Sequence, residues 1–298
     1  QTFSRWALLL IVLGPVNGFA APFNEIVVFG DSLSDNGNLL FFDQQPKPDP
    51  EYYYDGRLSN GPVWVEYLAE SGRLNAPLTD VALAGARTDG LVPPGLLEQV
   101  SVYIAAQGFS LSGGALYIIW IGGNDFLNGD GDSQAAVNNI NAAMADLADA
   151  GALHVLVLNL PDLGAIPDTL GTDEAAQATA FTLDFNNRLA AVLDQFSLDR
   201  PGVGLYSYNV FTLFESVQAD PTAYGFTNAS APSPNYTVPN NFDGAGHVFW
   251  DDIHPTTAMH VEIADQVYND LNAQLPATMV PESDDGGGCF IEALQFQK

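Results

Sequence analysis

The chain has 298 residues, of which 47% are hydrophobic and 15% are charged, a balance that suits a packed globular core and argues against disorder. Its 8 basic and 36 acidic residues give a formal net charge of −28, which repels phosphate backbones and anionic lipid headgroups at long range, so we expect no nucleic-acid partner. The single cysteine, Cys289, allows no internal disulfide, and core packing must therefore hold the fold.

The first twenty residues predict a secretory signal. Arg5 precedes an apolar run over residues 6–13, a Gly14-Pro15 break follows, and the chain then reads GFA up to Ala20. The run is well short of the roughly 20 residues that span a bilayer, so we expect cleavage after Ala20, with an uncleaved anchor as the alternative. The protein is therefore expected to be secreted, extracellular or periplasmic, with no membrane span after cleavage.

Beyond the signal, strand-like and helix-like runs alternate along the chain. Strands are expected over residues 25–29, 79–83, 115–121, 153–158 and 203–206. Helices are expected over residues 62–70, 96–106, 133–150, 174–196, 210–217 and 256–271. The strand runs are almost continuously apolar, which is typical of strands that are covered on both faces. The alternation therefore predicts an α/β fold with a parallel sheet and helices on either side.

Three stretches lie outside this alternation. Residues 41–56 hold three prolines and then three tyrosines, and residues 227–246 are rich in Asn, Pro, Ser and Gly. Both are expected to be long surface loops, which often line a site in a compact domain. Residues 276–298 are expected to form a flexible tail. The expected organisation is thus a signal over residues 1–20, one domain over residues 21–275, and the tail.

A serine directly follows the first expected strand, and an aspartate and a histidine share a late loop. A serine hydroxyl is a weak nucleophile and needs a base within hydrogen-bond reach, so His254 is the best candidate partner for Ser32. Asp251 can orient the imidazole, although spacing alone does not exclude Asp252. Ser34 is the nearby alternative to Ser32, and we expect it to be a hydrogen-bonding residue of the turn.

Other polar or glycine residues also follow expected strands directly. In open α/β sheets the active site lies beyond the carboxyl ends of the strands, so Ser32, Gly85, Asn124 and Asp162 are expected to gather at one edge. Acyl transfer requires donors aimed at the oxyanion of the tetrahedral intermediate. Gly85 can offer its backbone N–H and Asn124 its side-chain amide, beside the N–H of Ser32.

The remaining histidines give no sign of a metal site. His154, His247 and His260 lack metal-ligand spacing, so we expect no metal and no cofactor. His154 and His260 are expected to be structural, whereas His247 can line the pocket.

Four of these blocks, taken in order, resemble the GDSL, or SGNH, hydrolase family. They are the GDSL sequence around Ser32, the strand-end Gly85, the GGND sequence around Asn124, and the DxxHP sequence that holds Asp251 and His254. The resemblance implies a flavodoxin-like three-layer α/β/α sandwich with a central parallel sheet, and ester hydrolysis without a metal. It implies that Ser32 is the nucleophile, that His254 is the base and then the acid, and that Asp251 orients His254. It implies an oxyanion hole made by Ser32, Gly85 and Asn124.

Further stretches narrow the resemblance to one branch. Residues 56–64, 159–164 and 249–251 resemble the secreted phospholipase/lecithinase/hemolysin-like branch, and the resemblance extends over residues 23–275. The block around Gly85 usually reads Gly-Gly preceded by Asn, whereas this chain has Ala84-Gly85 and Asp80, so the wall of the site is expected to differ. No Gly-x-Ser-x-Gly elbow occurs, which disfavours a conventional α/β-hydrolase.

The expected function is a secreted serine esterase or lipase acting on a small-molecule or lipid ester. Short-chain esters, lipids and lysophospholipids are the favoured substrates, and an acetylated carbohydrate is the alternative. A catalytically silent surface-binding protein is the alternative of another class. Tyr52, Tyr53 and Tyr54 can grip an acyl chain or a sugar, or simply pack their loop, and the sequence leaves both interpretations open.

Overall fold

A five-stranded parallel sheet forms the centre of the computed structural model, which describes residues 22–42, 47–128 and 131–275. The strand order is β2-β1-β3-β4-β5, and every pairing is parallel. The strands are β1 (Glu25–Gly30), β2 (Leu78–Asp80), β3 (Ala115–Trp120), β4 (His154–Leu158) and β5 (Gly204–Tyr208). This is the flavodoxin-like order, which confirms the fold class predicted from the sequence.

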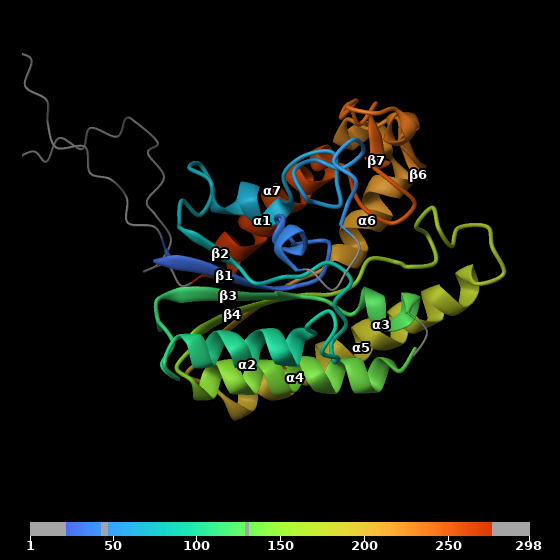
Figure 1. Cartoon of the computed structure of the whole chain (residues 1–298). Coiled ribbons are helices and arrows are strands. Elements are labelled where there is room, and N and C mark those ends of the chain that lie inside the picture. The colour runs from blue at the N-terminus through green and yellow to red at the C-terminus, as the bar shows by residue number, and fades with distance from the viewer. Residues whose placement is uncertain (1–21, 43–46, 129–130, 276–298) are drawn as a thin grey trace, which may run out of the picture.

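Helices cover both faces of the sheet (Figure 1). One face carries α2 (Leu96–Ala106), α4 (Ser133–Asp149) and α5 (Ala175–Asp199). The other face carries α1 (Trp64–Ala69), α6 (Val210–Ala219) and α7 (Thr257–Gln274). The result is the three-layer α/β/α sandwich that the sequence predicted.

The alternation of side chains along β3 explains why its sequence is apolar throughout. Leu116, Ile118 and Trp120 point into the core beneath α1, α6 and α7. Tyr117 and Ile119 point into the core beneath α2, α4 and α5, because successive side chains of a strand face opposite ways. Burial of each such large side chain stabilises the fold by about 1.5–3 kcal/mol. A charge placed on β3 is therefore buried whichever way it faces.

The second strand is shorter than expected and begins earlier. The sequence predicted residues 79–83, whereas β2 ends at Asp80. The Asp80 carboxylate accepts the backbone N–H groups of Ala82 and Asn36, each at 2.9 Å. The strand ends there, although the N–H groups of Val81 and Leu83 still donate to the Val28 and Gly30 carbonyls of β1, at 2.8 and 3.1 Å.

The interval 227–246 is more regular than expected. It contains the strand β6 (Asn228–Pro232), which pairs with β7 (His247–Phe249), and a 3-10 turn, η3 (Pro234–Thr237). Phe249 is buried and its ring lies 6.1 Å from the ring of Phe214 on α6, which attaches the small sheet to the main body. Smaller elements are η1 (Asn38–Phe41), α3 (Gly123–Leu127) and η2 (Pro221–Tyr224).

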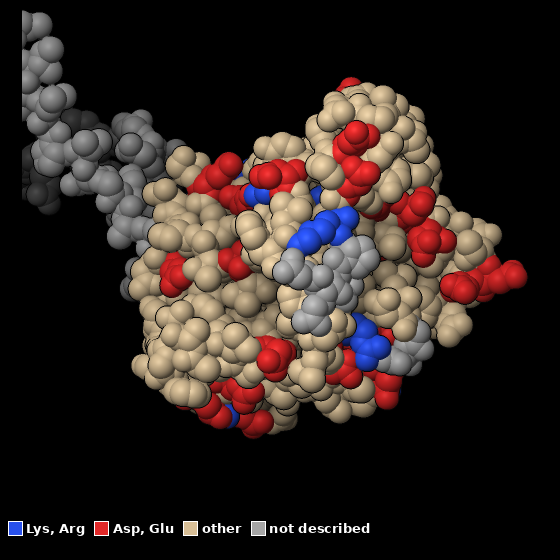
Figure 2. Space-filling view, viewed as in Figure 1, with Lys and Arg blue, Asp and Glu red and all other residues tan. Residues whose placement is uncertain are grey.

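The expected signal over residues 1–20 and the expected tail over residues 276–298 lie outside the described residues. Among the described residues, no helix is both long enough and apolar enough to cross a membrane. On the face shown in Figure 2, Asp and Glu side chains are scattered, and the few Lys and Arg side chains form no broad basic patch. That distribution agrees with the expectation that the chain repels phosphate backbones at long range.

Candidate active site

The turn that follows β1 presents Ser32 and buries its neighbours. Asp31 Oδ1 accepts the N–H of Leu33 at 3.0 Å, and the Asp31 carbonyl accepts the N–H of Ser34 at 3.1 Å. Ser34 is fully buried, and its hydroxyl accepts the indole N–H of Trp64 at 3.0 Å. Ser34 thus has the structural role that the sequence suggested, and Ser32 is the serine of this turn that lines a cavity.

The late loop brings His254 onto Ser32. His254 Nε2 lies 2.9 Å from Ser32 Oγ, and His254 Nδ1 lies 2.7 Å from Asp251 Oδ2. Asp251 Oδ1 accepts the backbone N–H groups of Ile253 at 2.8 Å and of His254 at 2.6 Å, which fix the carboxylate. This pairing puts the imidazole proton on Nδ1 and leaves Nε2 as the acceptor for the serine hydroxyl. The geometry therefore selects Asp251, whereas the Asp252 carbonyl accepts the N–H of Asp168.

Electrostatics favour a charged pair in this loop. Burial by itself lowers the pKa of His254, but the Asp251 carboxylate, with a smaller contribution from Asp31, outweighs burial and leaves that pKa raised. Burial by itself raises the pKa of Asp251, but His254 and the two backbone N–H groups leave it lowered. Burial raises the pKa of Asp31 to about 7. The site thus stabilises an imidazolium beside a carboxylate, the state that forms when a base removes the serine proton.

Two further predicted residues lie at the same cavity. Gly85 has φ of +81°, a left-handed conformation that favours glycine. Asn124 lies at the start of α3, and its Nδ2 donates to the Ala86 carbonyl at 3.0 Å. That bond orients the amide and leaves its second hydrogen for an acceptor in the cavity. The structure therefore brings Ser32, His254, Gly85 and Asn124 together around one cavity.

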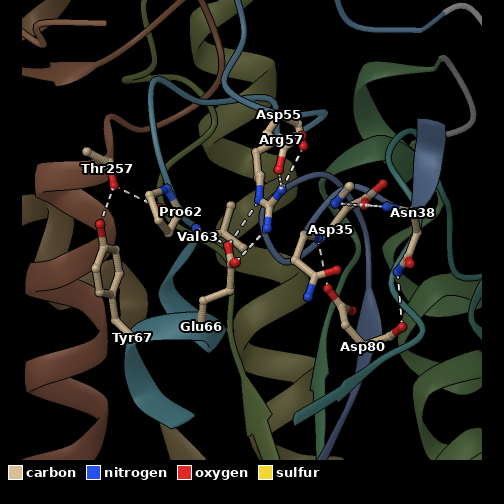
Figure 3. A network of polar contacts seen from close by, with 12 residues as sticks. Asp35, Asn38, Asp55, Arg57, Pro62, Val63, Glu66, Tyr67, Asp80 and Thr257 are labelled. Carbon is tan, nitrogen blue, oxygen red and sulfur yellow. Dashed lines mark hydrogen bonds and ion pairs between the residues drawn. The ribbon is translucent and has the colours of Figure 1, made fainter. Parts of the chain in front are cut away.

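Buried carboxylates join the serine turn to the Gly85 segment (Figure 3). The Asp35 carboxylate accepts the N–H of Ala84 at 2.8 Å and, on its own turn, the N–H groups of Gly37, Asn38 and Leu39. The Asn38 amide donates to the Asp80 and Ala82 carbonyls at 3.0 and 2.9 Å. Sequence reasoning missed this network. The one sign of the network in the sequence was Asp80, at a position where the block around Gly85 departs from the family pattern.

The cavity beside Ser32 is apolar and has a volume of about 170 Å³. Besides the four site residues, it is lined by side chains that include Leu33, Trp120, Leu163, Ile166, Phe214 and Ile253. A second cavity of about 470 Å³ shares Gly85 and Asn124 with the first, and Arg87, Asp89 and Asn128 make its lining polar. The two cavities meet at the proposed oxyanion donors and differ in chemistry.

Other predicted residues have structural roles. The Asp162 carboxylate accepts the N–H of Gly164 and the hydroxyl of Thr179, at 2.9 and 2.7 Å, and does not line the apolar cavity. Neither does His247, whose Nδ1 lies 3.1 Å from the Ala245 carbonyl.

The two remaining histidines also lie away from the cavity. His154 Nδ1 contacts the Tyr206 hydroxyl at 3.2 Å. His260 is 1% exposed, and burial lowers its pKa to about 3. Across the described ranges, no cluster of His, Cys, Asp and Glu is suited to hold a metal.

Comparison with known proteins finds similarity to one family of lipases and acylhydrolases. The family model of the GDSL-like lipase/acylhydrolases matches residues 26–267. Thermolabile hemolysin of Vibrio parahaemolyticus is 30% identical in an alignment 271 positions long that covers 84% of this chain and 64% of that protein. Phosphatidylcholine-sterol acyltransferase of Aeromonas hydrophila is 24% identical in an alignment 335 positions long that covers 91% of this chain and 98% of that protein. The chain spans less than two thirds of the hemolysin and about half of esterase EstA of Pseudomonas aeruginosa, which is 27% identical.

Solved structures share the fold. A lipolytic protein of the G-D-S-L family from Veillonella parvula matches 82% of this chain and 96% of its own, with a TM-score of 0.50 and 17% identity. A carbohydrate acetylesterase from Sinorhizobium meliloti matches 85% of this chain and 100% of its own, with a TM-score of 0.51 and 15% identity.

Proposed function

The chain belongs to the GDSL-like lipase/acylhydrolase family and is a hydrolase of ester bonds, and from that membership we propose that it is a secreted serine esterase or lipase acting through an acyl-enzyme on Ser32. The observation that carries the proposal is the continuous contact from Ser32 Oγ to His254 at 2.9 Å and on to Asp251 at 2.7 Å. A catalytically silent binding protein does not require that alignment.

In the proposed reaction, His254 Nε2 takes the Ser32 proton as Oγ bonds to the ester carbonyl carbon. The N–H groups of Ser32 and Gly85 and the amide of Asn124 stabilise the resulting oxyanion, each donor contributing about 10²–10³ in rate. The imidazolium, stabilised by Asp251, then gives its proton to the departing alcohol. Water enters, His254 acts as base again, and the acid is released from Ser32.

We assign the acyl chain of the substrate to the apolar cavity. A cavity of roughly 150 Å³ lined by aliphatic and aromatic side chains holds a benzene-sized group. The 170 Å³ here therefore accommodates about six carbon atoms. An acetyl group would leave most of that apolar surface unfilled. The cavity therefore favours esters with an acyl chain longer than acetyl over an acetylated carbohydrate. The polar second cavity suits the alcohol portion of the ester.

An acyl-length series tests this assignment. We expect kcat/KM for p-nitrophenyl esters to rise from acetate to a chain of about six carbons, by up to roughly fourfold per methylene. Ile166→Phe narrows the cavity and should move the optimum to shorter chains, whereas Leu170→Phe, at a half-exposed position outside the cavity, should not. Highest activity on acetate, together with release of acetate from acetylated xylan, would instead support the carbohydrate alternative.

A further inference from the structure

The catalytic-loop carboxylate has a hydrogen-bond donor from a distant part of the chain. Tyr53 donates its hydroxyl to Asp251 Oδ2 at 2.8 Å, and the same oxygen accepts His254 Nδ1 at 2.7 Å. The other contacts to this carboxylate come from its own turn, through the N–H groups of Ile253 and His254. Among the described residues, Tyr53 is thus the donor that reaches Asp251 from another segment.

The hydroxyl of Tyr53 also contacts a second tyrosine, Tyr236. The hydroxyl oxygens of Tyr53 and Tyr236 lie 3.2 Å apart, and their ring centroids are 5.7 Å apart. A phenol has one hydrogen, so with the Tyr53 proton on the carboxylate the proton between the phenols comes from Tyr236. Burial, and then the charge of Asp251, raise the pKa of Tyr53 above its usual range. Tyr53 therefore keeps its proton, and remains a hydrogen-bond donor, over the pH range in which the site is active.

The loop that carries Tyr53 is firmly held. Trp250, next to Asp251, donates its indole N–H to the Tyr52 carbonyl at 2.9 Å, and the N–H of Asn240 donates to the Glu51 carbonyl at 2.7 Å. At the far end of the loop, the guanidinium of Arg57 bonds to Glu66 of α1 at 2.7 Å (Figure 3). These anchors need no tyrosine hydroxyl, so the direction of the Tyr53 hydroxyl is not explained by loop packing.

We propose that Tyr53 is a positioning residue of the esterase site, backed by Tyr236, which holds the Asp251 carboxylate toward His254 and moderates its charge. This inference rests on the proposed roles of Ser32, His254 and Asp251. A hydrogen bond to a carboxylate disperses its negative charge, so Asp251 attracts a proton on His254 less strongly. More of His254 is then free base near neutral pH, the form that accepts the serine proton.

The direction of the expected pH shift follows from the groups around His254. The carboxylates of Asp251 and Asp31 favour its imidazolium, and the charge of that imidazolium in turn helps to lower the pKa of the buried His260. Tyr53 and Tyr236 act on Asp251. Removal of the Tyr53 hydroxyl leaves the Asp251 charge less compensated and raises the pKa of His254. The pH range over which activity rises, the acid limb, then moves to higher pH.

The test is a pH profile of kcat/KM for Tyr53→Phe with one p-nitrophenyl ester. We expect the acid limb to move up by about half a unit or more, because a charge-assisted hydrogen bond is worth more than one unit of pKa before relaxation. Tyr54→Phe is the matched control, since its contacts with Phe242 and Arg57 are made by the ring, and it should keep the wild-type profile. Tyr236→Phe should shift the acid limb in the same direction by a smaller amount. It replaces Tyr53→Phe as the test variant if Tyr53→Phe fails to fold.

A folded Tyr53→Phe with the profile of Tyr54→Phe, or with an acid limb at lower pH, would overturn the inference and assign Tyr53 to loop packing. If Tyr53→Phe does not fold, an unshifted Tyr236→Phe would do the same. Ser32→Ala separates this failure from failure of the proposed function. If Ser32→Ala loses hydrolysis and the tyrosine variants keep the wild-type acid limb, only the role of Tyr53 is refuted. If folded Ser32→Ala keeps hydrolysis, the proposed esterase function is refuted as well.

Discussion

The nucleophile half of the site and the acid–base half are built in different ways. Ser32 and Asn124 closely follow β1 and β3, whose pairing fixes their spacing, and Gly85 lies on the segment after β2 that the Asp35 carboxylate holds through the N–H of Ala84. Asp251 and His254 sit on a loop that is held from outside by the two long intervals containing Tyr53 and Tyr236. The proposed nucleophile is thus positioned by the sheet, while its proposed base is positioned by the irregular segments around it.

The largest expected effect is on the loop half. Asp251→Asn should lower kcat by about 10⁴-fold, because the amide no longer fixes the productive imidazole tautomer. The wild type should lose activity as pH falls through the raised pKa of His254, above the ordinary histidine value of about 6.5. Without the Asp251 carboxylate, the lowering of the His254 pKa by burial is opposed only by the smaller contribution of Asp31, so the acid limb should move to lower pH. An acid limb that stays in place in the pH profile would contradict the Asp251 assignment.

The next effect lies on the sheet half and should leave the pH profile alone. Asn124→Ala should lower kcat by about 10²–10³-fold with little change in KM, because the oxyanion forms only in the transition state. Asn128→Ala is the control: it removes a 3.3 Å hydrogen bond from Asn128 Nδ2 to Asn124 Oδ1 but leaves the bond to the Ala86 carbonyl that orients the amide. Steady-state kinetics that show equal losses in the two variants would place Asn124 in a structural role.

The smallest effect should follow from loosening the loops without touching the site. Trp250→Phe removes the bond to the Tyr52 carbonyl, and because this acceptor is only partly buried, its loss of a partner costs at most about 1–3 kcal/mol. Thermal unfolding should show a melting temperature lower by about 2–4 °C per kcal/mol. The acid limb should stay at the wild-type pH because the Tyr53 hydroxyl is retained. A shifted limb would mean that loop packing, not the phenol, controls His254.

The same division decides what the sequence could predict. Strands such as β3 were predictable because they are apolar on both faces, and Ser32 and Asn124 closely follow two such runs. The strand β2 ends earlier than expected, at Asp80, whose carboxylate accepts two backbone N–H groups that no hydropathy pattern reveals. Tyr53 lies 198 residues from Asp251 in the chain. Its run of three tyrosines predicted a surface loop and left open whether the tyrosines bind substrate or pack the loop. Only the folded contact shows which side chain its hydroxyl reaches.

The central claim is that Ser32 forms the covalent intermediate, and trapping it is the most direct test. A p-nitrophenyl alkylphosphonate should transfer its phosphorus to Ser32 Oγ, with p-nitrophenolate leaving. Intact mass should show one adduct, and peptide mapping should place it on Ser32. Folded Ser32→Ala should take up no label and hydrolyse no ester, while Ser34→Ala, where it folds, should still be labelled. An adduct on another residue, or undiminished hydrolysis by folded Ser32→Ala, would contradict the account.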